Sequence, residues 1–354
     1  MTAAGLDAYL RDRAAADLYS GVVRVTAAGE ERFAGAYGWA SRAWRVPTTL
    51  DTRFDTASIT KLFTAASALQ QADAGAFTLD TPVMPFLGIE GTAISPEVTV
   101  RQLLTHTSGI GDDADEEAGE EYEDVYRDRP NYAIRETADF LPQFAYREPN
   151  FPPGTGCRYN NCAYVLAGLM IEKATGLPYR DVILRDVFGP AGMDGSGFFR
   201  MDRVEERIAE GADPVLDGLG AIVGWRRNIY SFPPQGSPDG GAVVTAGDLE
   251  RFVRAVTDGR LLSPASTAAF MSPQVDYRVR DGWAQRFGLG PWFHVEPDGS
   301  VLFLEKEGQN PGVSGAVRHY PGRDTTVVLL SNMAEGAWEP IRRVHHEVMA
   351  GTFG

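Results

Sequence analysis

The chain has 354 residues, of which 44% are hydrophobic and 10% aromatic, and its formal net charge is −15. Because a single hydrophobic core stops growing below this chain length, two lobes are expected. The negative charge argues against nucleic acid or an anionic membrane as a partner, and the longest apolar run, 163–171, is far below the roughly 18 residues of a membrane span.

The elements are predicted from apolar periodicity, in chain order. A helix is expected at about 6–18, followed by two strands, 20–27 and 32–39, with a turn at Gly29. Helical patterns dominate from Ser58 to about Arg207. Strand-like runs then return, and a helix closes the chain: the expected strands are 289–295, 301–306, 315–320 and 325–331, and the helix is 338–349.

The predicted fold class is α+β, with an antiparallel sheet of five or more strands flanked by helices, plus a mostly helical lobe. Strands from both ends of the chain would share the sheet. We therefore expect residues 1–75 and 236–354 to form the sheet lobe and residues 76–235 the helical lobe. The active-site cleft would lie between the two lobes.

Lysine is rare in this chain, and one lysine has a suggestive position. Of 33 basic residues only three are lysines, and Lys61 follows Ser58 in the one Ser-x-x-Lys of the sequence. On a helix, residues three apart share a face, and a desolvated lysine can take the proton of a serine hydroxyl, whereas arginine cannot. A helix-start serine beside a surface lysine would give the same pattern.

Two further segments carry chemistry. Tyr159 and Asn161 form a Tyr-x-Asn directly ahead of an apolar helical run, and Lys306 and Gly308 form a Lys-x-Gly ahead of a strand. A core tyrosine, a helix-capping asparagine and a strand-end lysine are each ordinary when taken alone. Together with Ser58, in this order and spacing, they are improbable by chance.

In these three motifs the chain resembles the penicillin-recognising serine hydrolases, most closely the class C β-lactamases, the family VIII esterases and related DD-peptidases. The stretches between the motifs agree with this resemblance and extend it over nearly the whole chain. They are Leu-Leu-Thr-His-Thr-Ser-Gly at 103–109, Gly-Gly-Ala-Val-Val-Thr-Ala-Gly-Asp-Leu at 240–249, and Phe-Gly-Leu-Gly-Pro-Trp at 287–292.

The resemblance implies a role for each motif residue. Ser58 would be the nucleophile, with either Lys61 or Tyr159 as its base. Tyr159 would pass the proton to the leaving group, and the ammonium groups of Lys61 and Lys306 would stabilise its phenolate. Asn161 would orient Lys61 and the substrate carbonyl. The backbone N–H groups of Ser58 and Gln309 would form the oxyanion hole, and Gly308 would leave room for substrate against its strand.

One position departs from the family pattern. The β-lactamases and DD-peptidases typically have Thr or Ser between the Lys and Gly of the third motif, where its hydroxyl helps to bind the substrate carboxylate. Here that position is Glu307. A carboxylate in the cleft would repel a substrate carboxylate, so we expect an esterase or amidase acting on small ester or amide substrates that lack this group. The alternative is a Glu307 side chain that points away from the cleft, and the objection to a substrate carboxylate is then weaker.

Other activities remain open from the sequence. A β-lactamase or DD-peptidase would use the same residues. An acyltransferase or cyclase would differ only in replacing water with another acceptor. A homologue that binds a ligand without catalysis is a further alternative, although the intact Ser58, Lys61 and Tyr159 argue against it. The sequence does not indicate the oligomeric state.

An acidic run, 112–128, has ten acids and one arginine. Such runs are usually solvated loops. Because the run directly follows the Thr-Ser-Gly signature, a lid over the cleft is the alternative, with Tyr122 and Tyr126 able to touch substrate.

The N-terminus has neither a basic start nor an apolar stretch, so no signal peptide is visible and a cytoplasmic enzyme is expected. In a reducing compartment Cys157 and Cys162 are expected as buried thiols, with a disulfide as the alternative. The five histidines and two cysteines show no metal-ligand spacing, so neither metal nor another cofactor is expected.

Overall fold

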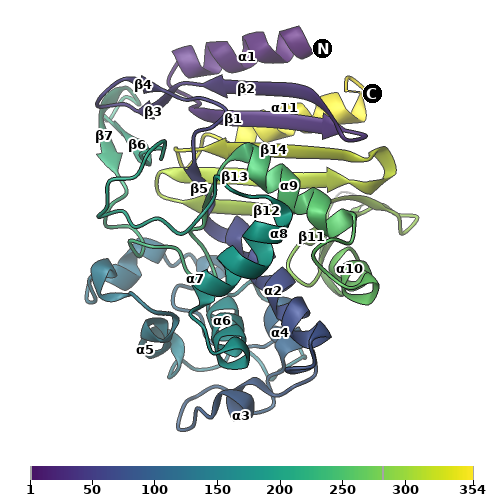
Figure 1. Cartoon of the computed structure of the whole chain (residues 1–354). Helices are drawn as coiled ribbons and strands as arrows, with labels where there is room; N and C mark the ends of the chain where they lie inside the picture. Colours follow the sequence, from purple (N-terminus) through teal and green to yellow (C-terminus); the bar gives the residue numbers. More distant parts are fainter. Residues whose placement is uncertain (1, 281–282, 354) are drawn as a thin grey trace.

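The computed structural model describes residues 2–280 and 283–353. Its centre is an eight-stranded antiparallel sheet with the order β2-β1-β14-β13-β12-β11-β10-β9 (Figure 1). Strands from both ends of the chain lie side by side in this sheet, where β1 pairs with β14 from Gly21↔Ser331 to Ala27↔Thr325. The predicted α+β fold, with one antiparallel sheet built from the two ends, is therefore confirmed.

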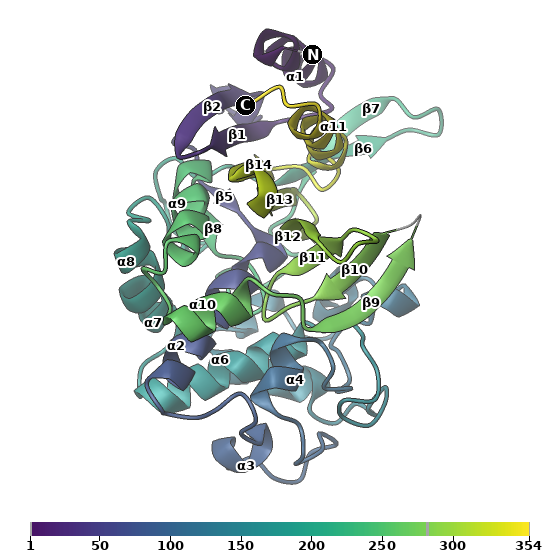
Figure 2. The ribbon, with the colours of Figure 1, turned by 90° about the vertical axis from the view of Figure 1, so that its right-hand side faces the viewer.

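The strands of the main sheet are β1 (Gly21–Ala27), β2 (Glu30–Tyr37), β9 (Val275–Arg280), β10 (Trp283–Phe287), β11 (Trp292–Val295), β12 (Val301–Asn310), β13 (Val313–Tyr320) and β14 (Thr325–Ser331). Three short pairs lie outside it: β3 (Trp39–Ser41) with β4 (Val46–Pro47), β5 (Phe54–Asp55) with β8 (Val243–Val244), and β6 (Ala212–Leu216) with β7 (Ile222–Arg227). The β6–β7 hairpin projects from the body of the molecule (Figure 2).

The sheet is covered on both faces, which explains why β14 is apolar on both of its faces, at residues 327–330. On one face α1 (Ala3–Ala15) and α11 (Trp338–Met349) pack on residues such as Val327 and Leu329. On the other face α2 (Lys61–Asp73) and α9 (Ala246–Thr257) pack on Val328 and Leu330. Ser58 lies on this second side.

The helix α6 (Cys162–Thr175) is buried along its first ten residues and packs against α2. Shorter helices surround this pair: α3 (Val83–Leu87), α4 (Val100–Leu104), α5 (Leu141–Phe144), α7 (Tyr179–Val182), α8 (Gly189–Ala191) and α10 (Pro264–Phe270). Single 3-10 turns include η1 (Ala57–Thr60), η2 (Glu116–Ala118) and η3 (Tyr122–Tyr126). Within the described ranges, no helix combines the length and apolar character needed to cross a membrane.

The structure departs from the sequence prediction in several places, and the short pairs β3–β4, β5–β8 and β6–β7 were not predicted. Strands β9 and β10, which form one edge of the sheet, were not predicted. β12 continues to Asn310, four residues beyond the predicted end at Lys306. Between α4 and α6 the chain forms short 3-10 turns and one four-residue helix rather than long helices, because this segment contains prolines and glycines that stop helices. The exact division into lobes stays a prediction.

Candidate active site

Ser58 lies in η1, which continues directly into α2. The chain enters η1 through Ala57, whose φ of 43° lies in the left-handed region that residues with a side chain rarely adopt. The carboxylate of Asp55 accepts a hydrogen bond from the N–H of Ala57 at 2.7 Å, and burial raises the pKa of Asp55 to about 6. A strained turn, held by this hydrogen bond, therefore presents Ser58 at the start of a buried helix.

Two proton-transfer groups reach the Ser58 hydroxyl. Lys61 Nζ lies 3.0 Å from Ser58 Oγ, and the phenol oxygen of Tyr159 lies 2.7 Å from the same atom. The Lys61 side chain is fully buried, and its Nζ also donates to Asn161 Oδ1 at 2.8 Å and to the carbonyl oxygen of Asp239 at 2.6 Å. The structure thus brings Ser58, Lys61, Tyr159 and Asn161 together.

Lys306 is the second lysine whose ammonium group lies near the Tyr159 ring. Its Nζ lies 5.0 Å from the centroid of the Tyr159 ring and 4.1 Å from that of Trp292. Lys61 Nζ lies 5.1 Å from the Tyr159 ring. Two buried ammonium groups beside one phenol favour its ionised form.

Gly308 allows β12 to approach the nucleophile closely. A Cβ at this position would lie 2.1 Å from the carbonyl oxygen of Thr56 and 3.1 Å from the backbone nitrogen of Ser58. The Ser58 N–H, one of the expected oxyanion donors, therefore lies directly beside β12. The side chain of Gln309 is directed elsewhere, donating to the carbonyl oxygen of Ala334 and to Glu335, so only its backbone N–H remains a candidate donor.

Glu307 does not lie where the sequence analysis expected it. Neighbouring residues of a strand point to opposite faces, and Gly308 faces Ser58. The carboxylate of Glu307 lies on the other face of β12, 3.5 Å from the Arg318 guanidinium. Burial and the nearby charge of Glu305 raise the pKa of Glu307 to about 7. The expected repulsion of a substrate carboxylate by Glu307 inside the cleft is therefore not supported by this arrangement.

Glu305 belongs to the same cluster on that far face. Its carboxylate accepts from Arg318 Nε at 2.6 Å and contacts His294 Nε2 at 2.5 Å. Although burial opposes ionisation, Arg318 and His294 hold the pKa of Glu305 at about 2.

Asp112 is a site residue that sequence reasoning missed. Its carboxylate accepts the backbone N–H groups of Asn161, at 3.0 Å, and of Cys162, at 3.0 Å, and so holds the first turn of α6. Asp112 and Asp113 are 5% and 2% exposed, which corrects the prediction that the whole acidic run is solvated. The available signal was position, because these two acids directly follow the Thr-Ser-Gly signature.

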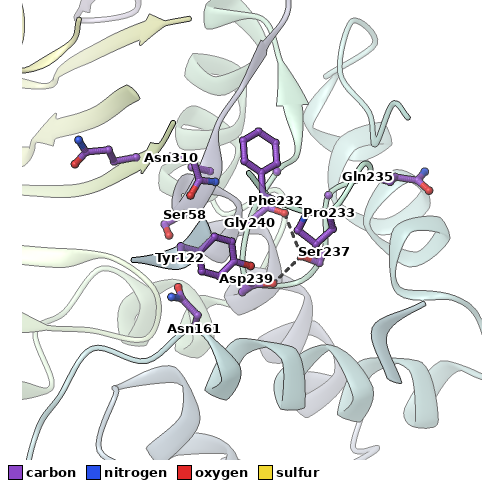
Figure 3. A pocket seen from close by; sticks show the side chains of 14 residues that line it. Ser58, Tyr122, Asn161, Phe232, Pro233, Gln235, Ser237, Asp239, Gly240 and Asn310 are labelled. Atoms are coloured by element: carbon purple, nitrogen blue, oxygen red, sulfur yellow. Dashed lines mark hydrogen bonds between the residues drawn. The ribbon is translucent and has the colours of Figure 1, made fainter. Parts of the chain in front are cut away.

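One residue of the acidic run 112–128, Tyr122, lines the pocket beside Ser58. Figure 3 shows Ser58, Tyr122 and Asn161 around the same space. The contacts that hold the acidic run include Arg226 to Glu123 at 2.7 Å and the phenol of Tyr277 to Glu117 at 2.7 Å. The remaining lining residues come mainly from two segments, 232–241 and 309–310.

Both cysteines are free thiols. Asp112, Asp113 and Cys162 have ligand atoms within 4.8 Å of one another, the one such group of three in the described residues. Burial raises the pKa values of Asp113 and Cys162 well above their usual ranges. The hydrogen bonds that Asp112 accepts from the N–H groups of Asn161 and Cys162 make this cluster part of the N-terminal cap of α6.

The chain is similar to known proteins both in sequence and in structure. The family model described as Beta-lactamase matches residues 6–348. Esterase EstB of Burkholderia gladioli is 31% identical over 270 residues, covering 71% of this chain and 68% of the esterase. A D-aminopeptidase of Cereibacter sphaeroides is 34% identical over 178 residues, covering 49% of this chain and 32% of that protein. The crystal structure of a penicillin-binding protein from Bacillus halodurans matches with a TM-score of 0.86 and 34% identity, covering 95% of this chain and 99% of that one.

Proposed function

The chain belongs to the β-lactamase family, and from that premise we propose that it is a serine hydrolase whose acyl-enzyme forms on Ser58. We further propose that it is an esterase or amidase for small substrates without a carboxylate. The observation that carries the proposal is the Ser58 hydroxyl, which lies within hydrogen-bond distance of both Lys61 Nζ and the Tyr159 phenol. Activation of a serine requires such a neighbouring base.

In the proposed reaction, Ser58 Oγ attacks the carbonyl carbon of the substrate while its proton passes to the base. The tetrahedral oxyanion accepts hydrogen bonds from the N–H groups of Ser58 and Gln309, each donor being worth roughly 3 kcal/mol of barrier. Tyr159 then protonates the departing alcohol or amine as the bond to it breaks. Water then attacks the ester on Ser58 while its proton passes to the base. The bond to Ser58 Oγ breaks, Oγ is protonated again, and the acid is released.

The contacts of Lys61 support Tyr159 as the base. An ammonium group has three donors, and Lys61 Nζ has three acceptors around it: Ser58 Oγ, Asn161 Oδ1 and the Asp239 carbonyl oxygen. This arrangement suits the charged form of Lys61. A charged Lys61 stabilises a Tyr159 phenolate and cannot itself take the proton.

The pocket supports the choice of substrate class. Its lining in the described part of the chain includes the aromatic side chains of Tyr122 and Phe232 and one carboxylate, Asp239, but no lysine or arginine (Figure 3). Position 307 offers no hydroxyl to the cleft either. Neutral or cationic esters and amides fit such a lining better than anions do.

A penicillin-directed activity is the second candidate. Because Glu307 faces Arg318 on the far side of β12, its charge does not exclude a carboxylate from the cleft. Acyl transfer to an alcohol or amine would use the same residues as hydrolysis.

The test is a panel of substrates with matched variants: a p-nitrophenyl acetate ester, a D-alanine p-nitroanilide and benzylpenicillin. We expect turnover of the ester or the anilide to exceed that of penicillin and to be lost in Ser58→Ala. Ser67→Ala is the control, because Ser67 is a fully buried serine of α2 whose hydroxyl has no partner among the described residues. Penicillin as the best substrate would move the assignment to the second candidate, and full activity of Ser58→Ala would refute the serine mechanism.

A further inference from the structure

His106 is a buried side chain beside the candidate site that the proposed reaction does not use. It follows α4 within the stretch Leu-Leu-Thr-His-Thr-Ser-Gly and is 1% exposed. Its φ of 58° lies in the left-handed region. Residues other than glycine are uncommon in that region, and a backbone held there is often found at functional sites.

This one residue contacts three consecutive residues of the tyrosine motif. Its carbonyl oxygen accepts the N–H of Arg158 at 3.0 Å, and its ring Nδ1 accepts the N–H of Asn160 at 3.1 Å. Between these two hydrogen bonds, the imidazole ring lies against the ring of Tyr159 with the centroids 4.6 Å apart. His106 therefore holds the backbone on both sides of Tyr159 as well as the phenol ring.

The remaining surroundings of the imidazole are aromatic and leave it little freedom. The ring of Phe287 lies 4.8 Å away and that of Tyr164 5.3 Å away, measured between centroids. The imidazole cannot move without disturbing one of these packed rings.

The same contacts keep His106 neutral and prevent it from acting as a base. Because Nδ1 accepts the Asn160 N–H, the ring proton must be on Nε2. Burial, and next the charges of Lys306 and Lys61, lower the pKa of His106 well below its usual range. The imidazole therefore adds no third positive charge beside Tyr159, and its basic nitrogen is already occupied.

We propose that His106 is a positioning residue that holds the Tyr159 phenol at 2.7 Å from Ser58 Oγ. This inference rests on the proposed function, since it requires that Tyr159 takes part in acylation. Its strained backbone and buried ring serve to fix the angle and distance of the proton transfer rather than to move a proton.

A double-mutant cycle tests the proposal on p-nitrophenyl acetate, with wild type, His106→Ala, Tyr159→Phe and the double variant. Misplacing a catalytic group by about 1 Å can cost about 10²-fold in rate. We therefore expect His106→Ala to lower kcat/KM by about 10²-fold, mainly through kcat. In the Tyr159→Phe background the same change should cause no further loss.

His106→Asn keeps the protein testable if the alanine variant folds poorly. Asparagine tolerates the left-handed backbone and places an oxygen near the position of Nδ1, but it lacks the ring. We expect its activity to lie between wild type and His106→Ala. His345→Asn is the control: His345 is half-buried, its Nδ1 contacts the Tyr320 phenol at 2.9 Å, and it lies on α11 against the opposite face of the sheet.

Two outcomes would overturn the inference, and they are distinguishable. If Tyr159→Phe is impaired but the losses are additive in the double variant, His106 acts on the fold and this inference alone is wrong. If Tyr159→Phe is fully active, the role of Tyr159 in the proposed function is wrong and the positioning role falls with it.

Discussion

Replacing Gly308 with alanine tests whether catalysis requires the close approach of β12 to the backbone around Ser58. The added Cβ would lie 2.1 Å from the carbonyl oxygen of Thr56, whereas real Cβ contacts are essentially never shorter than 3.0 Å. The strand and η1 must therefore separate by about 0.9 Å. Thr56 cannot give way alone, because its hydroxyl and its N–H both bond to the carbonyl oxygen of Ala242.

Moving β12 away from η1 should lower the catalytic rate more than the stability of the fold. Overpacking of this kind typically costs about 1–3 kcal/mol of stability. A shift approaching 1 Å between Ser58 and β12 would spoil the proposed oxyanion hole, so we expect kcat/KM for p-nitrophenyl acetate to fall by about 10²-fold to 10³-fold. Steady-state kinetics, with thermal unfolding measured in parallel, separates the two effects.

Two glycines provide controls. Gly322→Ala adds a methyl group where no atom lies within 4 Å, and at Gly240 a Cβ would lie 3.5 Å from Ala57, an ordinary contact. Both variants should fold normally, and Gly322→Ala should keep full activity. Unchanged kcat/KM in Gly308→Ala would refute the claim that the close approach of β12 forms part of the catalytic site.

The remaining predictions concern three side chains. Lys61→Arg should lower kcat/KM by about 10³-fold, close to the loss in Lys61→Ala, because the fully buried site fits an ammonium and not a guanidinium; near wild-type rates would show that only the charge matters. Tyr122→Ala should raise the preference for a p-nitrophenyl octanoate over the acetate by about tenfold, whereas the same change at the exposed Tyr132 should not, and an unchanged ratio would show that Tyr122 does not limit the acyl group. Folding raises the pKa of Glu307 to about 7. The stability linked to this shift is therefore fully present below the pKa that Glu307 has in the unfolded chain, and it is lost as the pH rises through about 7. Glu307→Gln should therefore raise the melting temperature more at pH 9 than at pH 5, and an equal change at both would contradict the raised pKa.

Much of the site was accessible from sequence because its spacing is local. Ser58 and Lys61 lie one helical turn apart, and Tyr159 and Asn161 precede an apolar run that forms α6. The closing helix begins and ends as predicted, at Trp338 and Met349, since its apolar residues repeat at helical spacing. The roles of these site residues stay predictions until the variants are measured.

The orientation of Glu307 away from the cleft was the alternative that the sequence left open, and strand geometry favours it. Once Lys306 and Gly308 were assigned to the cleft, strand alternation already placed Glu307 on the opposite face. The burial of Asp112 is different, because it depends on where the N-terminus of α6 lies in the folded chain. The tyrosine motif that His106 contacts lies about fifty positions further along the chain and Phe287 lies further still, so no local pattern could show these contacts.

The most direct test of the central claim is to locate the covalent intermediate. The protein is mixed with p-nitrophenyl acetate, quenched within seconds in acid, digested and analysed by mass spectrometry. The account predicts one acetyl group on the peptide that contains Ser58 and none in Ser58→Ala. Rapid turnover with the acetyl group on another residue, or the same labelling in Ser58→Ala, would contradict it.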